Sequence, residues 1–275
     1  MAWARWTPYT GLFSFRGHWG SIGMLRVRLL VLVGLLLAGI TAHGAEPVQM
    51  MTNFWPPYVD KTLPEEGLAV ELAKHIFKRA GYQAHNTVEQ LPKDSELAHF
   101  GSYDVVAALW PGEEPRKDYI YSKPYLVNEM IVVTPTQNAR RYFSIGNLKG
   151  GRIGLLKDHS YGVDFSEIAG VRLIYATSMT QNLVDMFDDK LHYVVGDRHV
   201  IAQQLGENFP IGEQQVRVLA ISLPPRPLHV AALRDNPQGA ALIKAFNSAL
   251  VEVKRDSSYQ QIVKKWRQRY QLQTP

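Results

Sequence analysis

Short apolar runs alternate along the chain with longer segments in which apolar residues recur at helical spacing. The apolar runs predict β-strands at residues 48–52, 104–109, 130–134, 153–156, 173–176, 192–195, 216–221 and 229–233. Helical spacing predicts helices at residues 68–79, 181–187, 199–205, 238–254 and 259–270. Strands that alternate with helices are typical of an α/β protein with parallel or mixed sheets. The run at 104–109 is nearly continuous, which indicates a strand buried on both faces.

Two proline-containing segments indicate where the chain passes between two parts of the fold. One follows the strand at 130–134, and the other contains Pro224, Pro225 and Pro227. Proline fixes an extended backbone and cannot continue a helix or a central strand. We therefore predict a first lobe of residues 46–134 plus 227–275 and a second lobe of residues 135–226.

The first 45 residues have the layout of a secretory signal. Arg26 and Arg28 precede an apolar run at 29–40, and small residues follow at 41–45. The pattern predicts cleavage after Gly44 and a translation start at Met24. The alternative is an uncleaved membrane anchor, for which a twelve-residue run is short. We expect export to the periplasm.

Composition narrows the classes of partner. The 275 residues are 46% hydrophobic and include 30 basic and 25 acidic residues, but four of the basic residues and no acidic ones lie in residues 1–45. Removing those four leaves 26 against 25, a net charge of +1, which does not favour nucleic acid. The chain has no cysteine, so it has no disulfide, thiolate metal site or lipidated cysteine. The histidine spacing does not match a zinc site, and we expect neither a metal nor a cofactor.

The loop after the strand at 104–109 carries candidate binding chemistry. The loop after a strand lies at its carboxyl end, where open α/β sheets place their ligands. Arg116 can bind a carboxylate through two parallel hydrogen bonds, and Trp110, Tyr119 and Tyr121 supply flat apolar surface near it. The alternative is a solvated surface arginine among loop aromatics.

The same segment resembles the bacterial extracellular solute-binding proteins, family 3, which are the amino-acid-type receptors of ABC importers. The resemblance rests on Gly101, Asp104, Arg116, Ser122, Pro124 and Tyr125 and on a final helix with the pattern Tyr-x-x-Ile-x-x-x-Trp. It extends over about residues 48–270 and implies the type II periplasmic-binding-protein fold: α/β, with two lobes joined by a hinge of two crossings. The threonine that the family places before the arginine is absent, and the spacing from arginine to serine is one residue short.

The resemblance implies that Arg116 binds the α-carboxylate of a ligand and that Asp197 binds its ammonium group. Asp197 follows the apolar strand at 192–195, so a zwitterion would be held between the two lobes. Alternatively, Asp197 caps the helix that begins near His199, because aspartate is a favoured N-cap residue.

Four other residues complete the expected ligand-binding set. The resemblance places Trp55 and Tyr58 in an aromatic loop over the ligand and Ser160 in a loop that holds the carboxylate. Trp110 is the fourth, as apolar surface beside Arg116. The aromatic residues could instead belong to the core. Ser160 also stands near the pattern of a hydrolase nucleophile elbow, but the first glycine of that elbow is replaced by Asp158.

The expected function is capture of a small polar solute, an amino acid or a related amine or carboxylate, for an ABC permease. We expect a monomer with no catalytic residues that closes around its ligand. One alternative is a periplasmic enzyme that resembles cyclohexadienyl dehydratases, with Glu129, His159 or Asp197 as acid or base. Another is a receptor that reports to a membrane sensor.

Overall fold

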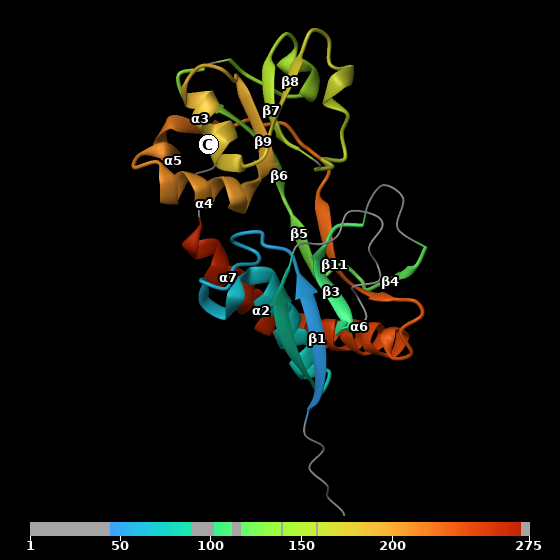
Figure 1. Ribbon diagram of the computed structural model, residues 1–275. Helices are drawn as coiled ribbons and strands as arrows, with labels where there is room; N and C mark the ends of the chain where they lie inside the picture. Colours follow the sequence, from blue (N-terminus) through green and yellow to red (C-terminus); the bar gives the residue numbers. More distant parts are fainter. Residues whose placement is uncertain (1–44, 90–101, 112–116, 139, 158, 271–275) are drawn as a thin grey trace, which may run out of the picture. The chain divides into compact units, whose positions relative to one another are not determined.

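Two β-sheets with flanking helices form the described part of the protein (Figure 1). The computed structural model describes residues 45–89, 102–111, 117–138, 140–157 and 159–270. The first sheet has the strand order β2-β1-β3-β11-β4, and β5 pairs with β11. Its strands are β1 (Glu46–Thr52), β2 (Tyr82–Val88), β3 (Val105–Leu109), β4 (Tyr119–Tyr121), β5 (Leu126–Asn128) and β11 (Arg226–Leu233).

The second sheet has the order β10-β6-β9-β7-β8. Its strands are β6 (Met130–Pro135), β7 (Arg152–Leu156), β8 (Arg172–Ala176), β9 (Tyr193–Asp197) and β10 (Val216–Val218). Both sheets are mixed. In the first, β1 is parallel to β2 and β3, and in the second, β7 is parallel to β8 and β9. β11 and β6 run antiparallel to their neighbours. The predicted fold class is confirmed.

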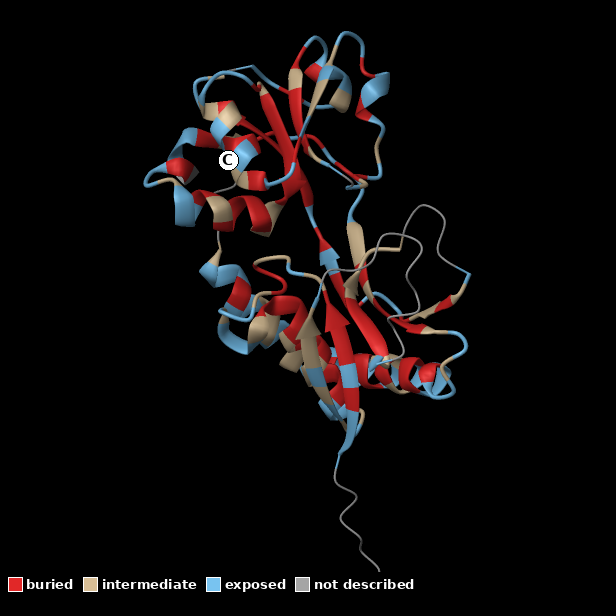
Figure 2. Cartoon of the chain, viewed as in Figure 1, coloured by how far each residue is buried: buried red, intermediate tan, exposed pale blue. Residues whose placement is uncertain are grey.

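Three long helices accompany the first sheet: α2 (Leu68–Arg79), α6 (Gly239–Arg255) and α7 (Ser258–Arg269), which contact one another. The sequence predicted all three to within one residue at each end. Leu68, Leu72 and Ile76 lie on one face of α2 and are fully buried. Each such leucine or isoleucine contributes about 1.5–3 kcal/mol relative to an exposed side chain. Figure 2 shows buried residues along the strands and on the inner helix faces.

Helices α3 (Met179–Phe187) and α4 (Arg198–Asn208) contact each other and the second sheet, α3 at strands β7 and β9 and α4 at β9. A short helix, α5 (Gly212–Gln215), follows α4, and 3₁₀ helices lie at η1 (Pro64–Glu66), η3 (Ile145–Leu148) and η4 (Phe165–Glu167). Within the described residues, no helix combines the length and apolar character that crossing a membrane requires.

One strand lies in a different sheet from the predicted one. The proline that follows residues 130–134 predicted that this strand belongs to the first lobe. In the structure it is β6, which pairs with β9 and β10 of the second sheet. The first crossing therefore lies at Glu129, between β5 and β6, and the return lies between β10 and β11. An apolar run indicates a buried strand but not its neighbours, because either sheet would bury it equally well.

Candidate functional site

The aromatic loop of residues 54–58 is fastened to the first turn of α2. The Ala69 N–H donates to the Tyr58 carbonyl at 3.0 Å, which satisfies one of the N–H groups that a helix start leaves free. Gly67 has φ +106°, and a Cβ there would lie 2.5 Å from the Tyr58 carbonyl oxygen. Only glycine therefore allows loop and helix to approach so closely.

Two aromatic rings of this loop form a cluster with the ring of Trp110. Trp55 lies 4.8 Å from Tyr58 and 5.0 Å from Trp110 between ring centroids, the second pair edge to face. Tyr58 is 1% exposed, whereas Trp55 and Trp110 are half-buried. The neighbouring Phe54 is 66% exposed and contacts none of the three rings. Trp55 and Trp110 thus keep apolar surface that a ligand can contact.

An irregularity in β3 precedes Trp110. The pairing of β3 with β11 shifts between His229 and Ala231, and Ala108 adopts φ +55°. The Ala108 N–H donates to the Tyr125 hydroxyl at 3.1 Å instead of continuing the ladder. A left-handed conformation at a residue with a side chain is uncommon and costs about 1–2 kcal/mol, so the surrounding structure must hold it. This bend comes two residues before Trp110.

Asp197, at the end of β9, receives four hydrogen bonds. The Tyr58 hydroxyl and the His199 and Val200 N–H groups donate to Oδ1 at 2.8, 2.9 and 3.0 Å. The Asn128 amide donates to Oδ2 at 2.9 Å. Asp197 is therefore the N-cap of α4, as one of the two interpretations of the sequence predicted. It also connects the second sheet with the Tyr58 and Asn128 side chains of the first lobe.

Burial controls the protonation of this group of side chains. It raises the pKa of the Asp197 carboxyl, although the charge of His199 and the hydrogen-bond donors act in the opposite direction. Burial also lowers the pKa of His199, which outweighs the attraction of Asp197. It raises the pKa of Tyr58 well above its ordinary value, and the nearby Asp197 charge adds to this effect. Tyr58 is therefore a neutral donor at physiological pH.

Asn128 connects the aromatic rings to Asp197. The Trp110 indole N–H donates to Asn128 Oδ1 at 2.9 Å, and the other end of the same amide reaches Asp197. Asn128 is fully buried. Sequence reasoning missed this residue, because both of its partners belong to other segments of the chain and a buried amide is recognised only once they are in place.

The loop of residues 159–162 follows β7. The His159 ring lies 6.3 Å from the Trp110 ring, edge to face, and Ser160 is half-buried. Tyr161 anchors the loop, because its hydroxyl accepts a hydrogen bond from the Leu156 N–H at 2.7 Å. Of the six residues predicted to bind ligand, Trp55, Tyr58, Trp110 and Asp197 are directly connected, and Ser160 lies in this adjacent loop. The sixth, Arg116, lies outside the described residues.

Glu129 and His159, two of the residues considered as an acid or base, make contacts within the protein. Glu129 forms a two-point ion pair with Arg198, with N–O distances of 2.7 and 2.8 Å. His159 Nδ1 lies 3.1 Å from the Lys157 carbonyl oxygen. The part of the chain that the structure describes contains no group of three or more potential metal ligands.

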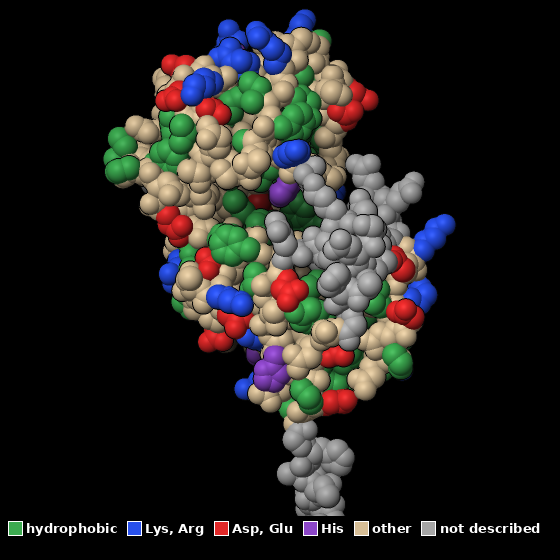
Figure 3. All heavy atoms as spheres, in the orientation of Figure 1, with side chains coloured by type: hydrophobic (Ala, Val, Ile, Leu, Met, Phe, Trp, Pro, Cys, Tyr) green, Lys and Arg blue, Asp and Glu red, His purple; other side chains and the backbone are tan. Residues whose placement is uncertain are grey.

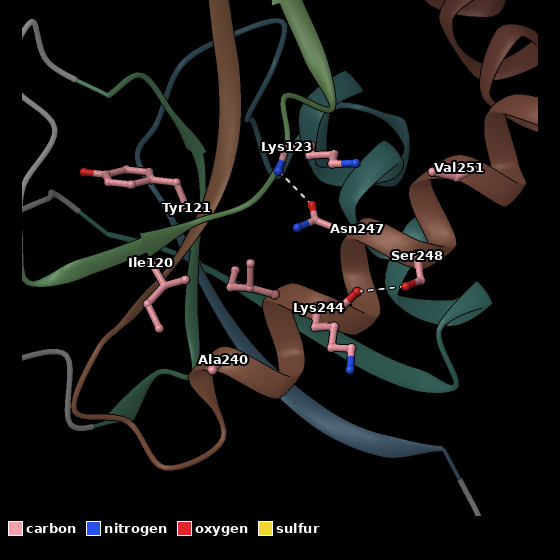
Figure 4. Close-up of a pocket in the computed structure, with 9 residues that line it drawn as sticks. Ile120, Tyr121, Lys123, Ala240, Lys244, Asn247, Ser248 and Val251 are labelled. Atoms are coloured by element: carbon pink, nitrogen blue, oxygen red, sulfur yellow. Dashed lines mark hydrogen bonds between the residues drawn. The ribbon is translucent and has the colours of Figure 1, made fainter.

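A surface groove of about 450 Å³ lies elsewhere in the first lobe (Figure 4). It is formed by the β4 region and α6, where the Lys123 N–H donates to the Asn247 side chain at 2.7 Å. Of the predicted ligand-binding residues that the structure describes, none lines it. On the face in Figure 3, acidic and basic side chains are interspersed, and Lys and Arg side chains group over the end of the second sheet where β7 and β8 begin.

Comparisons with known proteins agree with this architecture. The Escherichia coli (strain K12) protein "ABC transporter arginine-binding protein 1" is 26% identical over 245 residues, which cover 86% of this chain and 98% of the relative. The solved structure of an ancestral arginine-binding protein bound to arginine has a TM-score of 0.64 and 23% identity, covering 82% of this chain and 99% of that one. An ancestral arginine-binding protein bound to glutamine has a TM-score of 0.62 and 23% identity, with the same coverage.

The family assignment rests on a match that extends over most of both lobes. The model of the bacterial extracellular solute-binding proteins, family 3, matches residues 48–269, from β1 to the end of α7. This confirms the predicted resemblance. The chain therefore belongs to the bacterial extracellular solute-binding proteins, family 3.

Proposed function

We propose that this protein captures an amino acid or a related small amine or carboxylate between its two lobes and delivers it to an ABC permease. The observation that carries the proposal is the connected group formed by Trp55, Tyr58, Trp110, Asn128 and Asp197. Its members come from both sheets, so a ligand bound there can contact both lobes. The names of the relatives, which refer to arginine, support an amino-acid ligand.

The proposed mechanism depends on a ligand that makes more contacts when the two lobes are close together than when they are apart. A ligand that touches both lobes stabilises the arrangement in which the lobes approach, because it binds that arrangement better than the separated one. In the proposal, Trp55 and Trp110 contact the ligand, and Arg116 and Ser160 hold its carboxylate. Asp197 would accept its ammonium group through Oδ2, which receives one hydrogen bond among the described residues. Tyr58 would act through its hydroxyl by orienting Asp197.

The strand pairing changes the predicted boundaries of the two lobes. The first lobe takes the strands up to β5 together with β11, α6 and α7, and the second takes β6 to β10. The two crossings at Glu129 and at residues 219–225 serve as the hinge. We further propose that the protein acts as a monomer in the periplasm after removal of its signal.

A thermal-shift screen followed by calorimetry tests the function. The exported, purified protein is titrated with L-arginine, L-glutamine and the other standard amino acids. At 100 times the dissociation constant, a ligand adds about 2.7 kcal/mol to the free energy of unfolding. For a chain of this size that corresponds to an increase in Tm of about 5–10 °C. Small-angle scattering on the same samples should give a smaller radius of gyration with ligand.

The outcomes separate the function from its alternatives. A stabilising ligand recovered unchanged by mass spectrometry supports the binding protein. A ligand recovered in chemically altered form would replace the proposal with the enzyme. No stabilisation by any amino acid, amine or simple carboxylate would contradict it.

A further inference from the structure

Arg226, the first residue of β11, lies against the aromatic part of the candidate site. Its guanidinium carbon is 5.2 Å from the centroid of the Trp110 ring. Trp110 is itself fixed by its hydrogen bond to Asn128, the residue that pairs with Arg226 between β5 and β11. One face of the guanidinium is thus held by an aromatic ring, in a cation–π contact.

Among the described residues, no anionic group neutralises the charge of Arg226. Within the described residues, its guanidinium has no ion pair or hydrogen bond, and its Nε is buried. Arg217 also has a buried Nε, but its Nη2 donates to the carbonyls of Asn138 and Arg140. Arg198 is paired with Glu129. Arginine does not lose its proton in proteins, so a partly buried guanidinium without an anion is unfavourable.

The other neighbour of Arg226 is the loop after β7. A Cβ built on Gly162 would lie 3.4 Å from the Arg226 Nη1 atom and also 3.4 Å from Pro224. Gly162 therefore leaves the guanidinium close to the loop that carries His159 and Ser160. Arg226 consequently lies between Trp110 of the first lobe and this loop of the second lobe, on the strand that follows the return crossing.

We propose that Arg226 binds the anionic group of the ligand, a carboxylate, through its guanidinium. This deepens the proposed function, on which it rests, by adding a residue from the hinge strand to the ligand contacts. The bound carboxylate would neutralise Arg226 and, through it, connect the 159–162 loop with Trp110. The site then requires a ligand with a carboxylate, and an uncharged analogue would leave the buried cation unpaired.

The test compares carboxylates with their amides in two proteins. Wild type and Arg226→Met are titrated with L-glutamine, L-arginine, their α-carboxamides, acetate and sulfate, using calorimetry and thermal shift. Methionine keeps apolar contact with Trp110 while removing the charge. Arg172→Met is the matched control, because Arg172 is an exposed arginine at the start of β8. We expect Arg226→Met to weaken carboxylate binding about 10- to 100-fold, with the amides binding equally weakly to both proteins.

Titration with acetate and sulfate distinguishes a failure of the Arg226 proposal from a failure of the proposed amino-acid function. If acetate or sulfate stabilises wild type more than Arg226→Met while no amino acid binds, the anion site stands and the amino-acid function falls. If amino acids bind both proteins equally, the function stands and the role of Arg226 falls. A lower Tm of ligand-free Arg226→Met with an unchanged ratio of carboxylate to amide affinity would show a merely structural residue. Absence of any anion effect on wild type would also overturn the inference.

Discussion

At the scale of single residues, Asp197 is where the contacts of the candidate site converge. Its Oδ1 accepts from two N–H groups of α4 and from the Tyr58 hydroxyl, and its Oδ2 accepts from Asn128. A variant that removes this side chain therefore changes both stability and binding. Ligand contact has to be tested with a variant that keeps the helix cap.

We predict that Asp197→Ala lowers the free energy of unfolding by about 2–4 kcal/mol, because the cap is lost and buried donors are left unsatisfied. Asp197→Asn keeps an oxygen for the α4 N–H groups and for Tyr58, so its loss should be smaller. Urea denaturation followed by circular dichroism measures both. Equal losses in the two variants would show that the cap contributes nothing.

His199 should make stability depend on pH. Its pKa is lowered by burial, while an unfolded histidine titrates near about 6.5. The unfolded state therefore binds more protons, and the stability that neutral His199 contributes is complete above about pH 6.5 and is lost as pH falls through the folded pKa. The raised pKa of Asp197 acts in the opposite sense, since its contribution is lost as pH rises.

We predict that wild type loses more unfolding free energy between pH 7 and pH 5 than His199→Gln does. Asp197 is present in both proteins, so the difference between the two slopes reports the histidine together with the effect of its charge on Asp197. Urea midpoints at half-unit pH intervals give the slopes. Parallel curves would mean that His199 has an ordinary pKa in the folded state.

At the scale of elements, the bend in β3 carries strain at one alanine. Ala108 has φ +55°, whereas the adjacent, fully buried Ala107 is not among the residues with positive φ. We predict that Ala108→Gly is neutral or stabilises by up to about 1 kcal/mol, because glycine adopts this conformation without a clash. Ala107→Gly, the matched control, should destabilise by about 1 kcal/mol. Thermal unfolding of both variants decides, and a clear loss in Ala108→Gly would contradict the strain.

The last helix is fixed to α2 by a buried tryptophan. Trp266 is 2% exposed, and its indole N–H donates to Glu71 Oε2 at 2.6 Å. We predict that Trp266→Phe costs about 1 kcal/mol, the value of the hydrogen bond, and that Trp266→Ala costs about 3–5 kcal/mol. Urea denaturation gives both values. A similar cost for the two variants would place the contribution in the hydrogen bond instead of in packing.

At the scale of the whole molecule, the predicted signal is tested by where the protein is found and where its chain begins. β1 begins at Glu46, two residues after the expected cut. We predict that the protein expressed from its own coding sequence in a Gram-negative host is found in the periplasmic fraction. Its intact mass should correspond to a chain that begins at Ala45. A membrane-bound protein that retains residues 29–40 would favour the uncleaved anchor instead.

Much of the element order could be predicted from the sequence because periodicity is a local property. The spacing of Leu68, Leu72 and Ile76 gave the bounds of α2, and Gly81 adopts φ +90° beyond its end. The predicted strand at 216–221 was too long, since β10 ends at Val218, and β5 was missed. Three-residue strands are too short to produce a pattern.

The sequence by itself determined the α/β class, the five longer helices that the structure describes and the role of Asp197 as a possible cap, because each of these depends on residues near one another in the chain. It also determined the family, through motifs that each lie within one short segment. Tertiary structure decided which sheet β6 joins, that Asn128 links Trp110 to Asp197, and that Arg226 stands beside Trp110. These depend on partners that lie far away in the sequence, such as Asn128 and Asp197. Hydrogen bonds between such residues form only when folding brings the strands together, so no local pattern encodes them.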